Sequence, residues 1–514
     1  MRAVCQAGVV LGIDAHPVEV QVRLTRGLPR FDIVGLPETA VKEARLRVSS
    51  AIDACQFAFP QRRVLLNLAP ADLRKSGTAF DLAIAIAVLC TSGGCAPNLL
   101  AGTLIIGELS LTGEVRGISG ALAQLRSARD RGLGRAIVPL ENAAEAQFMS
   151  GIEILCAKDL KEVVGFLNGV STLPEAQSLN GDVAGPCQTQ SPTEDMADIR
   201  GQAIAKRALE IAAVGHHNVL LTGPPGAGKT MLARRLPGIL APPTREESLL
   251  IATVAGVARS YSGSAHDQCQ RPFRSPHHTI SDVAMMGGGV PVRPGEVTLA
   301  HGGVLFLDEL AEFRSNAIEA LRTTMEQGEI HIARSLYRVT LPAKPLVVAA
   351  MNPCPCGYAG DAKHICTCSI DRIARYRSKV SGPLLDRFDI HVHVPAVKIR
   401  DLSQAKTAEK STEIAQRVSL AQSFAQSRHS CMGKLNPLRS QVARVMERAA
   451  EHFGLSARAW DKVIRVARSI ADLEQTTHIE AEHVAEAFQY RFVDRSQHAK
   501  TSMATSMLEA MPEH

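Results

Sequence analysis

Residues 223–230 read Gly223-Pro224-Pro225-Gly226-Ala227-Gly228-Lys229-Thr230, a glycine-rich run that ends in Lys-Thr. The apolar segment 218–221 precedes this run, and the helical pattern MLARRL follows it. A phosphate-binding P-loop has this strand–loop–helix context, whereas an ordinary glycine-rich turn does not need it. We expect all eight residues to surround a nucleoside triphosphate. Backbone N–H groups and Lys229 would bind the phosphates, and the Thr230 hydroxyl would bind Mg²⁺.

Two later apolar runs also end in polar side chains. Residues 303–307 lead into Asp308 and Glu309, and residues 346–351 lead into Asn352. With a P-loop upstream, Asp308 suits a contact to Mg²⁺, Glu309 suits a water-polarising carboxylate, and Asn352 could hold the attacking water. Taken alone, an apolar strand ending in Asp-Glu is common, and Asn before Pro is more often a turn former.

The chain divides into three structured parts. Residues 1–170 mix strand and helix patterns, with strands at 18–24, 64–68, 103–107 and 134–138 and a buried helix at 80–89. Residues 171–197 are rich in Ser, Thr, Pro, Gln and Gly, which is typical of a linker. Residues 198–395 alternate buried strands with helices, which predicts a parallel sheet covered on both faces. Residues 396–514 contain helical patterns at 439–454, 456–473 and 479–491, with Ser456 as an N-cap.

Composition excludes several classes of protein. The 514 residues are 46% hydrophobic and 21% charged, as in globular proteins, which argues against a disordered or collagen-like chain. The longest strictly apolar run, at 82–90, is about half of what a membrane span requires, and the N-terminus lacks the pattern of a secretory signal. We therefore expect a cytoplasmic protein with no membrane contact, whose 12 cysteines are thiols or metal ligands.

The net charge of +6 does not identify a polyanionic partner, because it is spread thinly along the chain. Residues 1–170 carry 18 basic and 16 acidic residues, residues 171–395 carry 22 and 21, and residues 396–514 carry 17 and 14. Only local patches can therefore indicate a nucleic acid.

Two arginines have both a catalytic and an ordinary interpretation. Arg387 lies between Asp386 and Asp389. It could pair with one of them, or it could act as an arginine finger on the γ-phosphate held by a neighbouring subunit. Arg458, near the start of a C-terminal helix, could sense phosphate within its own chain or simply be solvated.

Taken in order, the P-loop, LFLDEL (305–310), AAMNPCPCGY (349–358), RYRSKVSGPLLDRFDIHV (375–392) and LSARAWDKVIRVARSIADLE (455–474) resemble the ComM/YifB competence-protein family of magnesium-chelatase-like AAA+ ATPases. The resemblance covers nearly the whole chain. It implies a homohexameric ring that hydrolyses ATP with Mg²⁺. Lys229, Thr230, Asp308, Glu309 and Asn352 match ATP-site motifs within one subunit, Arg387 matches the finger position shared with minichromosome-maintenance helicases, and Arg458 matches sensor 2.

The same resemblance extends to the two other regions and to two insertions. Residues 273–289 and the hairpin-like residues 328–341 resemble insertions that line the central pore in relatives, and Arg334 and Arg338 of the hairpin would offer cations to DNA phosphates. An edge hairpin with solvated arginines is the alternative. The implied fold is an α/β multidomain chain with a Lon-protease-type α+β N-terminal domain, an AAA+ P-loop parallel-sheet core and a C-terminal helical lid.

The Lon-type domain is expected to be without peptidase activity. The segments around Ala79 and Leu122 resemble those that carry the Ser-Lys dyad of Lon proteases, and here the two positions hold hydrocarbon side chains. A methyl and an isobutyl group cannot supply a nucleophile and a base. We therefore expect a binding or assembly module, with Lys75 and Ser76 as bystanders.

Residues 354–368 contain two C-x-C pairs, formed by Cys354 with Cys356 and Cys366 with Cys368. Four thiolates in a reducing compartment suit structural Zn²⁺, although C-x-C is tighter than the usual spacing, and free thiols or a regulatory disulfide are alternatives.

The densest basic patch of the chain follows these cysteines, and it consists of Arg372, Arg375, Arg377 and Lys379 around Tyr376. It predicts a surface that binds a nucleic-acid strand, with a solvated helix face as the alternative.

These features and the family resemblance leave two candidate functions. The first is an ATP-driven DNA motor, which the resemblance narrows to a hexameric helicase that drives branch migration and recombination during natural transformation, working on single-stranded or branched DNA alongside recombinase machinery. The second is a chelatase-type remodeller that applies the same ATPase to a protein or metal-insertion partner without moving along DNA. An ATP-dependent protease is weakened by the missing dyad.

Overall fold

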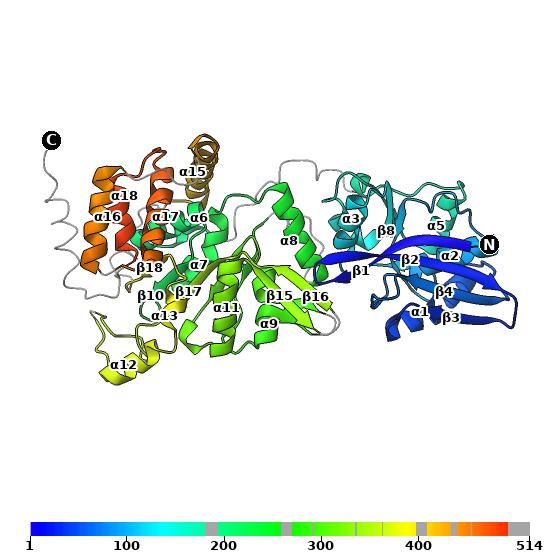
Figure 1. The fold of residues 1–514 in the computed structure, drawn as a ribbon, viewed down its shortest axis with the longest axis horizontal. Helices are drawn as coiled ribbons and strands as arrows, with labels where there is room; N and C mark the ends of the chain where they lie inside the picture. The colour runs from blue at the N-terminus through cyan, green and yellow to red at the C-terminus, as the bar shows by residue number, and fades with distance from the viewer. Residues whose placement is uncertain are drawn as a thin grey trace.

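The computed structural model describes residues 2–179, 194–258, 270–289, 292–334, 337–361, 363–396, 409–432, 439–453 and 455–491. It contains a mixed α/β N-terminal domain, a core built on a five-stranded parallel sheet, and a group of C-terminal helices. Figure 1 shows an elongated molecule with the N-terminal domain at one end and the C-terminal helices at the other. The predicted fold class is confirmed at this level.

The N-terminal domain is built on a seven-stranded sheet in which β1 pairs antiparallel with β2, and β2 with β4, while the outer pairs are parallel. In spatial order its strands are β3 (Arg30–Val34), β4 (Arg63–Ala69), β2 (Asp14–Thr25), β1 (Arg2–Leu11), β5 (Thr103–Ile105), β8 (Arg135–Pro139) and β9 (Glu153–Ala157). Its helices are α1 (Thr39–Ala54), α2 (Asp81–Ser92), α3 (Ala121–Asp130), α4 (Ala143–Ala146) and α5 (Leu160–Leu167), and β6 (Glu108–Leu109) pairs with β7 (Val115–Arg116).

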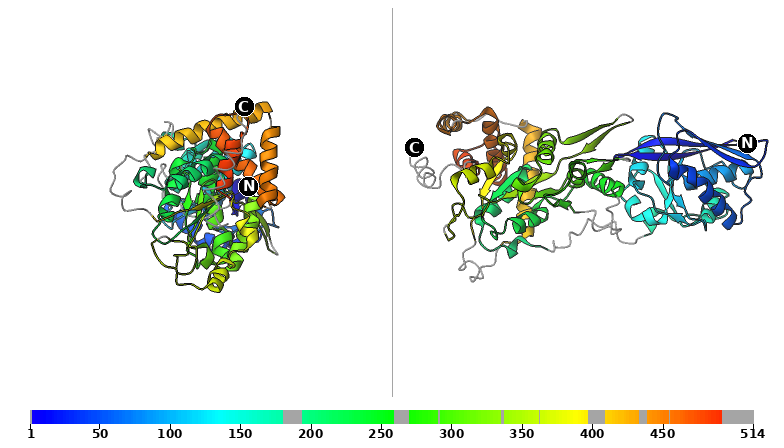
Figure 2. Two further views of the ribbon diagram at one scale, coloured as in Figure 1. Left: turned by 90° about the vertical axis from the view of Figure 1, so that its left-hand side faces the viewer. Right: turned by 90° about the horizontal axis from the view of Figure 1, so that it is seen from below.

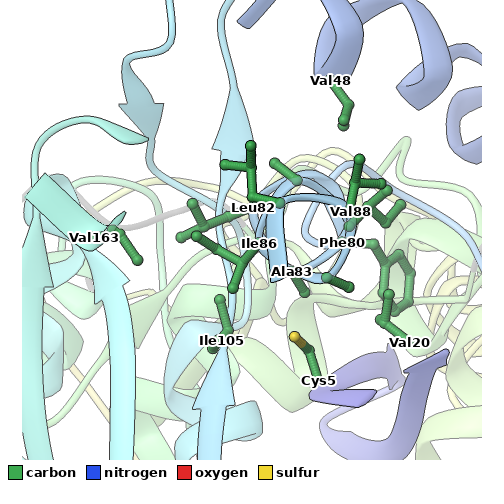
Figure 3. Close-up of a cluster of buried hydrophobic side chains, with 14 of the residues drawn as sticks. Cys5, Val20, Val48, Phe80, Leu82, Ala83, Ile86, Val88, Ile105 and Val163 are labelled. Carbon is green, nitrogen blue, oxygen red and sulfur yellow. The ribbon is translucent and has the colours of Figure 1, made fainter. Parts of the chain in front are cut away.

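Helix α2 is the centre of this domain. It is apolar on all sides, and a helix of that kind is stable only when it is enclosed. Figure 3 shows Leu82, Ile86 and Val88 of this helix among side chains from the sheet and from α1, including Val20 and Val48. The buried helix predicted at 80–89 is confirmed.

The core sheet is entirely parallel, as the sequence predicts. Its order is β11 (Phe273–Arg274), β14 (Val304–Leu307), β17 (Leu346–Met351), β10 (Val219–Thr222) and β18 (Ile390–His393). Its helices are α6 (Ala203–Gly215), α7 (Lys229–Arg235), α8 (Arg245–Val257), α9 (Asp282–Met286), α10 (Glu296–Leu299), α11 (Ser315–Gln327), α12 (Ile370–Arg377) and α13 (Gly382–Leu385). Two small ribbons complete it, β12 (Gly287–Gly288) with β13 (Arg293–Pro294) and β15 (Glu329–Arg334) with β16 (Tyr337–Pro342).

Alternate residues of the buried strands enter two different cores. Phe306 and Val348 face a cluster that also contains residues of the C-terminal helices, whereas Leu305 and Val347 face the opposite cluster. The C-terminal helices are α15 (Ser411–Met432), α16 (Ser440–Phe453), α17 (Ala457–Leu473) and α18 (Ala481–Gln489). They therefore share one core with the sheet. The sequence did not predict α15 or the short strands β11 and β18.

Among the described residues, the N-terminal domain contacts the core at the β1–β2 turn and beside α8. The turn between β1 and β2 puts Ile13 into the core cluster that contains Val339 and Leu341 of the β15–β16 hairpin. Beside α8, the Gly120 N–H donates to the Gly256 carbonyl at 3.2 Å. Figure 1 shows the β15–β16 hairpin on the side of the core that meets this domain, and the right-hand view of Figure 2 shows the N-terminal domain joined end to end with the core.

The predicted linker at 171–197 is partly incorporated into the adjoining domains. Leu173 and Ala176 are buried in the N-terminal domain, and Met196 is buried in the core. Residues 180–193 lie outside the described part of the chain. Among the described helices, none combines the length and the apolar character needed to cross a bilayer.

Candidate nucleotide site

Three neighbouring strands bring the predicted nucleotide-binding residues together. The P-loop follows β10, Asp308 follows β14, and Asn352 follows β17. Because these strands are parallel and adjacent, their carboxyl ends meet at one edge of the sheet, where open α/β sheets bind their ligands.

The P-loop has a backbone that favours glycine. Gly226 and Gly228 have φ values of +74° and +88°, in the left-handed region that L side chains rarely adopt. Gly223 is required for a different reason, because a Cβ atom there would lie 2.1 Å from the carbonyl oxygen of Val394. At Gly223 the chain therefore turns while packed against the residue that follows β18, and Gly228 leads directly into α7. An anion at this position would face the N–H groups at the start of α7.

The Lys229 side chain is held in place at the end of this loop, where α7 begins. Its ammonium donates to the carbonyl oxygens of Gly223 and Pro224 at 2.7 and 2.9 Å, and to Asn352 Oδ1 at 3.1 Å. Burial lowers the pKa of Lys229, and the carboxylates of Asp308 and Glu309 partly oppose this change. The side chain is therefore placed by several contacts before any phosphate binds, and Asn352 belongs to the same network.

The residues expected to hold Mg²⁺ fit that ion. The Thr230 hydroxyl donates to Asp308 Oδ2 at 2.9 Å, which places one hydroxyl and one carboxylate side by side. Oxygen ligands of these two kinds, completed by water and substrate phosphates, are what Mg²⁺ prefers. In the bound state Mg²⁺ would neutralise charge on the phosphates.

Glu309 has an unusual backbone for a non-glycine residue, with a φ of +53°. Backbone strain of this kind persists where the surrounding structure imposes it, often at functional sites. Its side chain is half exposed, and Glu309 Oε2 lies 3.4 Å from Nδ1 of His278. Sequence reasoning did not single out His278, although it lies in the inserted segment at 273–289.

Arg387 does not pair with either neighbouring aspartate, so that prediction is wrong among the described residues. Its guanidinium forms an ion pair with Glu326 of α11, while Asp386 pairs with Arg491 and Asp389 with Lys462. Arg387 Nε is buried, and none of the described residues offers it a hydrogen-bond acceptor. Within the described part of the chain the arginine therefore has one ion-pair partner and an unused donor, and its finger role stays a prediction.

Arg458 is exposed near the first turn of α17. Ser456 caps this helix as predicted, because its side chain accepts from the Ala459 N–H at 3.2 Å. The exposed position leaves Arg458 accessible to a ligand, and its role as sensor 2 stays a prediction.

The two surfaces predicted to bind DNA, the β15–β16 hairpin and α12, differ in which of their cationic side chains are exposed and unpaired among the described residues. Arg338 is exposed on β16 of the hairpin, while the side chain of Arg334 lies outside the described part of the structure. On α12, Arg372 and Arg375 are exposed and form no ion pair with described residues. Arg377 donates to the Pro353 carbonyl at 3.3 Å, and the Lys379 ammonium lies 3.0 Å from Glu312 Oε2. Their contact with DNA stays a prediction.

Three family models together match most of the chain. Residues 195–402 match "Magnesium chelatase, subunit ChlI", residues 19–142 match "Subunit ChlI of Mg-chelatase", and residues 408–491 match "Magnesium chelatase, subunit ChlI C-terminal". The chain belongs to the magnesium-chelatase ChlI-like family. Membership of this AAA+ family implies that the chain hydrolyses ATP, in agreement with the P-loop geometry.

Relatives within this family match over nearly their full length. The chain is 42% identical to YifB of Salmonella typhimurium, over 96% of this chain and 97% of the relative. It is 41% identical to YifB of Escherichia coli, over 94% and 96%. It is also 40% identical to competence protein ComM of Haemophilus influenzae, over 96% and 98%. Both YifB proteins are described as uncharacterized.

The four cysteines of residues 354–368 form one cluster. Their sulfur atoms all lie within 4.8 Å of one another, and the separations are 3.3 Å for Cys354–Cys356, 3.7 Å for Cys354–Cys366 and 3.5 Å for Cys356–Cys366. Sulfurs about 2.3 Å from a tetrahedral Zn²⁺ would be about 3.8 Å apart. A disulfide would need about 2.05 Å. The cluster can therefore bind Zn²⁺ as it stands.

Local N–H groups favour the thiolate form that Zn²⁺ requires at two of the four cysteines. The backbone N–H of Tyr358, together with the Cys354 side chain and other local donors, lowers the pKa of Cys356 to about 5, and the Ala359 N–H donates to Cys354 Sγ at 3.3 Å. In the absence of a metal ion, burial and the neighbouring thiols raise the pKa of Cys366 to about 11 and also raise that of Cys368.

Replacing Cys366 with Ser is expected to lower the zinc content of the purified protein by up to one equivalent per chain, because three thiolates hold the ion less tightly than four. Metal analysis of both proteins measures this loss. His364→Ala is the matched control, since His364 lies in the same loop and contacts Asp361 outside the cysteine set. Equal, zero zinc in all three proteins would leave free thiols as the explanation.

The two positions that resemble those of the Lon dyad lie at one apolar cluster of the ChlI-like N-terminal domain. Leu122 is completely buried there, and Ala79 packs against the same cluster. Hydrocarbon groups at both positions leave no nucleophile and base for peptide hydrolysis at this point.

Proposed function

We propose that this chain is an ATP-driven DNA motor that acts as a hexameric ring and promotes branch migration during natural transformation. The nucleotide site supports the ATP-driven part, because at the sheet edge Lys229 already contacts Asn352 and Thr230 already contacts Asp308. The name of the relative ComM supports the link to competence. The ring, its DNA substrate and an association with recombinase machinery belong to the proposal.

The observation that carries the DNA part of the proposal is the connection between the nucleotide site and exposed cations. Asn352, which contacts Lys229, is followed directly by the segment that leads to Arg372 and Arg375. Arg377 donates back to the Pro353 carbonyl, so α12 is tied to the tip of β17. A change at the γ-phosphate would therefore be transmitted to a surface that can bind phosphates of a nucleic acid.

Single-stranded DNA is expected to raise the ATPase rate of the wild-type protein about tenfold, as ring motors couple hydrolysis to a bound strand. Replacing both Arg334 and Arg338 with Ala should bring the ratio of the rates with and without DNA close to one. Steady-state hydrolysis at low salt, where phosphate contacts are strongest, measures both rates.

Arg26→Ala in the N-terminal domain is the control for this measurement, because it removes a positive charge at a site outside the proposed motor surfaces. If DNA leaves the wild-type rate unchanged at low salt, the DNA motor is wrong. The chelatase-type remodeller, which the family also contains, would then be the better function.

A further inference from the structure

The segment after Asn352 forms an arm beside the nucleotide site. It comprises residues 354–379, namely the four-cysteine loop and α12, and we call it the cysteine arm; Ala362 is outside its described part. Figure 1 shows α12 projecting below the parallel sheet, away from the C-terminal helices. Of the arm's described residues, Cys354, Gly357 and Tyr376 are buried, so the arm has little apolar core of its own.

Two isoleucines of this arm are almost fully exposed. Ile365 has 91% of its surface accessible and Ile370 has 86%, the first between Cys356 and Cys366 and the second at the start of α12. Among the other described residues, only Leu28 and Val170 are comparably exposed large hydrophobic side chains. These two side chains lie five positions apart beside the four-cysteine cluster. Together they form an exposed apolar surface of the kind that inserts into a binding partner.

The charges around the isoleucines identify the kind of partner. The arm contains five basic and two acidic residues, a net charge of +3 apart from the cysteines, which is half of the net charge of the whole chain. The carboxylate of Asp361 is turned inwards and accepts from the Lys363 N–H at 2.8 Å. Arg372 and Arg375 stay exposed within one or two turns of Ile370. Protein interfaces are depleted of charge at their apolar centre, whereas proteins that kink DNA combine apolar wedges with cations.

The base of the arm rests on the nucleotide site. A Cβ atom at Gly357 would lie 2.6 Å from Cδ of Pro225, so the arm's first turn is packed directly on the P-loop. Two residues before Cys354, Asn352 contacts the Lys229 ammonium at 3.1 Å. Movement of the P-loop or of Asn352 on nucleotide turnover would therefore displace the arm.

We propose that Ile365 and Ile370 form an apolar wedge that enters between base pairs at a DNA branch, while Arg372 and Arg375 bind the flanking phosphates. Isoleucine side chains can partly unstack a base step, and the bases then cover hydrocarbon that is otherwise in water. The arm's position on the P-loop makes the depth of insertion depend on the nucleotide state. This inference rests on the proposed DNA motor and adds the contact that would open the branch.

The test uses the full-length protein and a synthetic four-way junction that carries 2-aminopurine at the branch point. Wild-type protein with ATP should raise the fluorescence of this base, because unstacking removes its quenching. The double variant Ile365→Ser, Ile370→Ser should lose this rise. The double variant should also lower the number of branch-migration steps per ATP hydrolysed by about tenfold or more, because serine side chains cannot offset the free energy of unstacking a base step as isoleucine side chains do.

Two further variants distinguish loss of the apolar wedge from loss of folding. Leu28→Ser removes an equally exposed apolar side chain from the N-terminal domain and should behave as wild type. Ile365→Val with Ile370→Val keeps the apolar surface and should retain most of the fluorescence rise. Zinc content and thermal melting of every variant report whether the arm is still folded.

The outcomes distinguish failure of the isoleucine wedge from failure of the DNA motor. If the serine double variant is folded and unstacks the branch and migrates it as the wild type does, the wedge is wrong while the motor survives. If the wild-type protein itself neither responds to DNA nor migrates a junction, the DNA motor fails and the wedge fails with it. A double variant that is normal on DNA but loses binding to a protein would assign the isoleucines to a protein interface and overturn the wedge.

Discussion

Replacing Lys229 with Ala is expected to lower the ATPase rate by about 10²–10³, the cost of removing one preorganised donor from developing charge in an active site. The ammonium is already positioned by Gly223, Pro224 and Asn352, so its loss removes a donor that is in place before phosphate binds. Steady-state phosphate release measures the effect. Nucleotide affinity should fall as well, because the same ammonium contacts the bound phosphates.

The matched control for this variant is Lys42→Ala, which removes an exposed ammonium from α1 of the N-terminal domain. Thermal melting and oligomer size should show that the Lys229 variant is folded, because Lys229 is itself buried. A folded Lys229→Ala protein that hydrolyses ATP at the wild-type rate would place the ATPase site somewhere other than the P-loop.

Replacing Arg387 with Ala is expected to lower the ATPase rate by about 10³–10⁵, the range for loss of an arginine finger. Mixing this variant with the Lys229→Ala variant should restore part of the activity. In a random mixture about one quarter of the interfaces would join an intact P-loop to an intact finger from the neighbouring subunit. The rate of the mixture is compared with that of each variant alone at the same total concentration.

Glu326→Ala tests the competing explanation, in which Arg387 acts only through its ion pair within the chain. If the pair is structural, Glu326→Ala and Arg387→Ala should cause similar losses, and mixing should restore nothing. If Arg387 leaves Glu326 to reach a neighbour, removing Glu326 should leave hydrolysis intact or raise it. Mixed rings that form but show no recovery would contradict the finger.

The sequence predicted the central strands because each is a short, continuously buried apolar run that ends in a polar residue. β10, β14 and β17 have this pattern, and so their tips could be assigned to one site. β11 has two residues and gives no periodic signal. α15 was missed because its apolar residues, such as Ile414 and Val418, are diluted by Ser, Gln and Ala.

The nucleotide site was more predictable than its surroundings. A P-loop dictates its own backbone through Gly226 and Gly228, so eight consecutive residues were sufficient to define it. The contact of His278 with Glu309 joins an inserted segment to a distant strand tip. The ion pair of Arg387 with Glu326 joins residues of α11 and the segment after α13. Neither pairing has a fixed spacing along the chain.

The sequence by itself predicted that a phosphate-binding loop follows one parallel strand and that polar side chains follow two others. It also places hydrocarbon side chains, Ala79 and Leu122, at the positions that resemble those of the Lon dyad. These features are local or depend on residue type alone. Only the tertiary structure decided that four cysteines converge within one metal-sized cluster, and that Gly357 packs the cysteine arm against Pro225. Such contacts depend on how separate segments pack in space, and periodicity along the chain does not encode that packing.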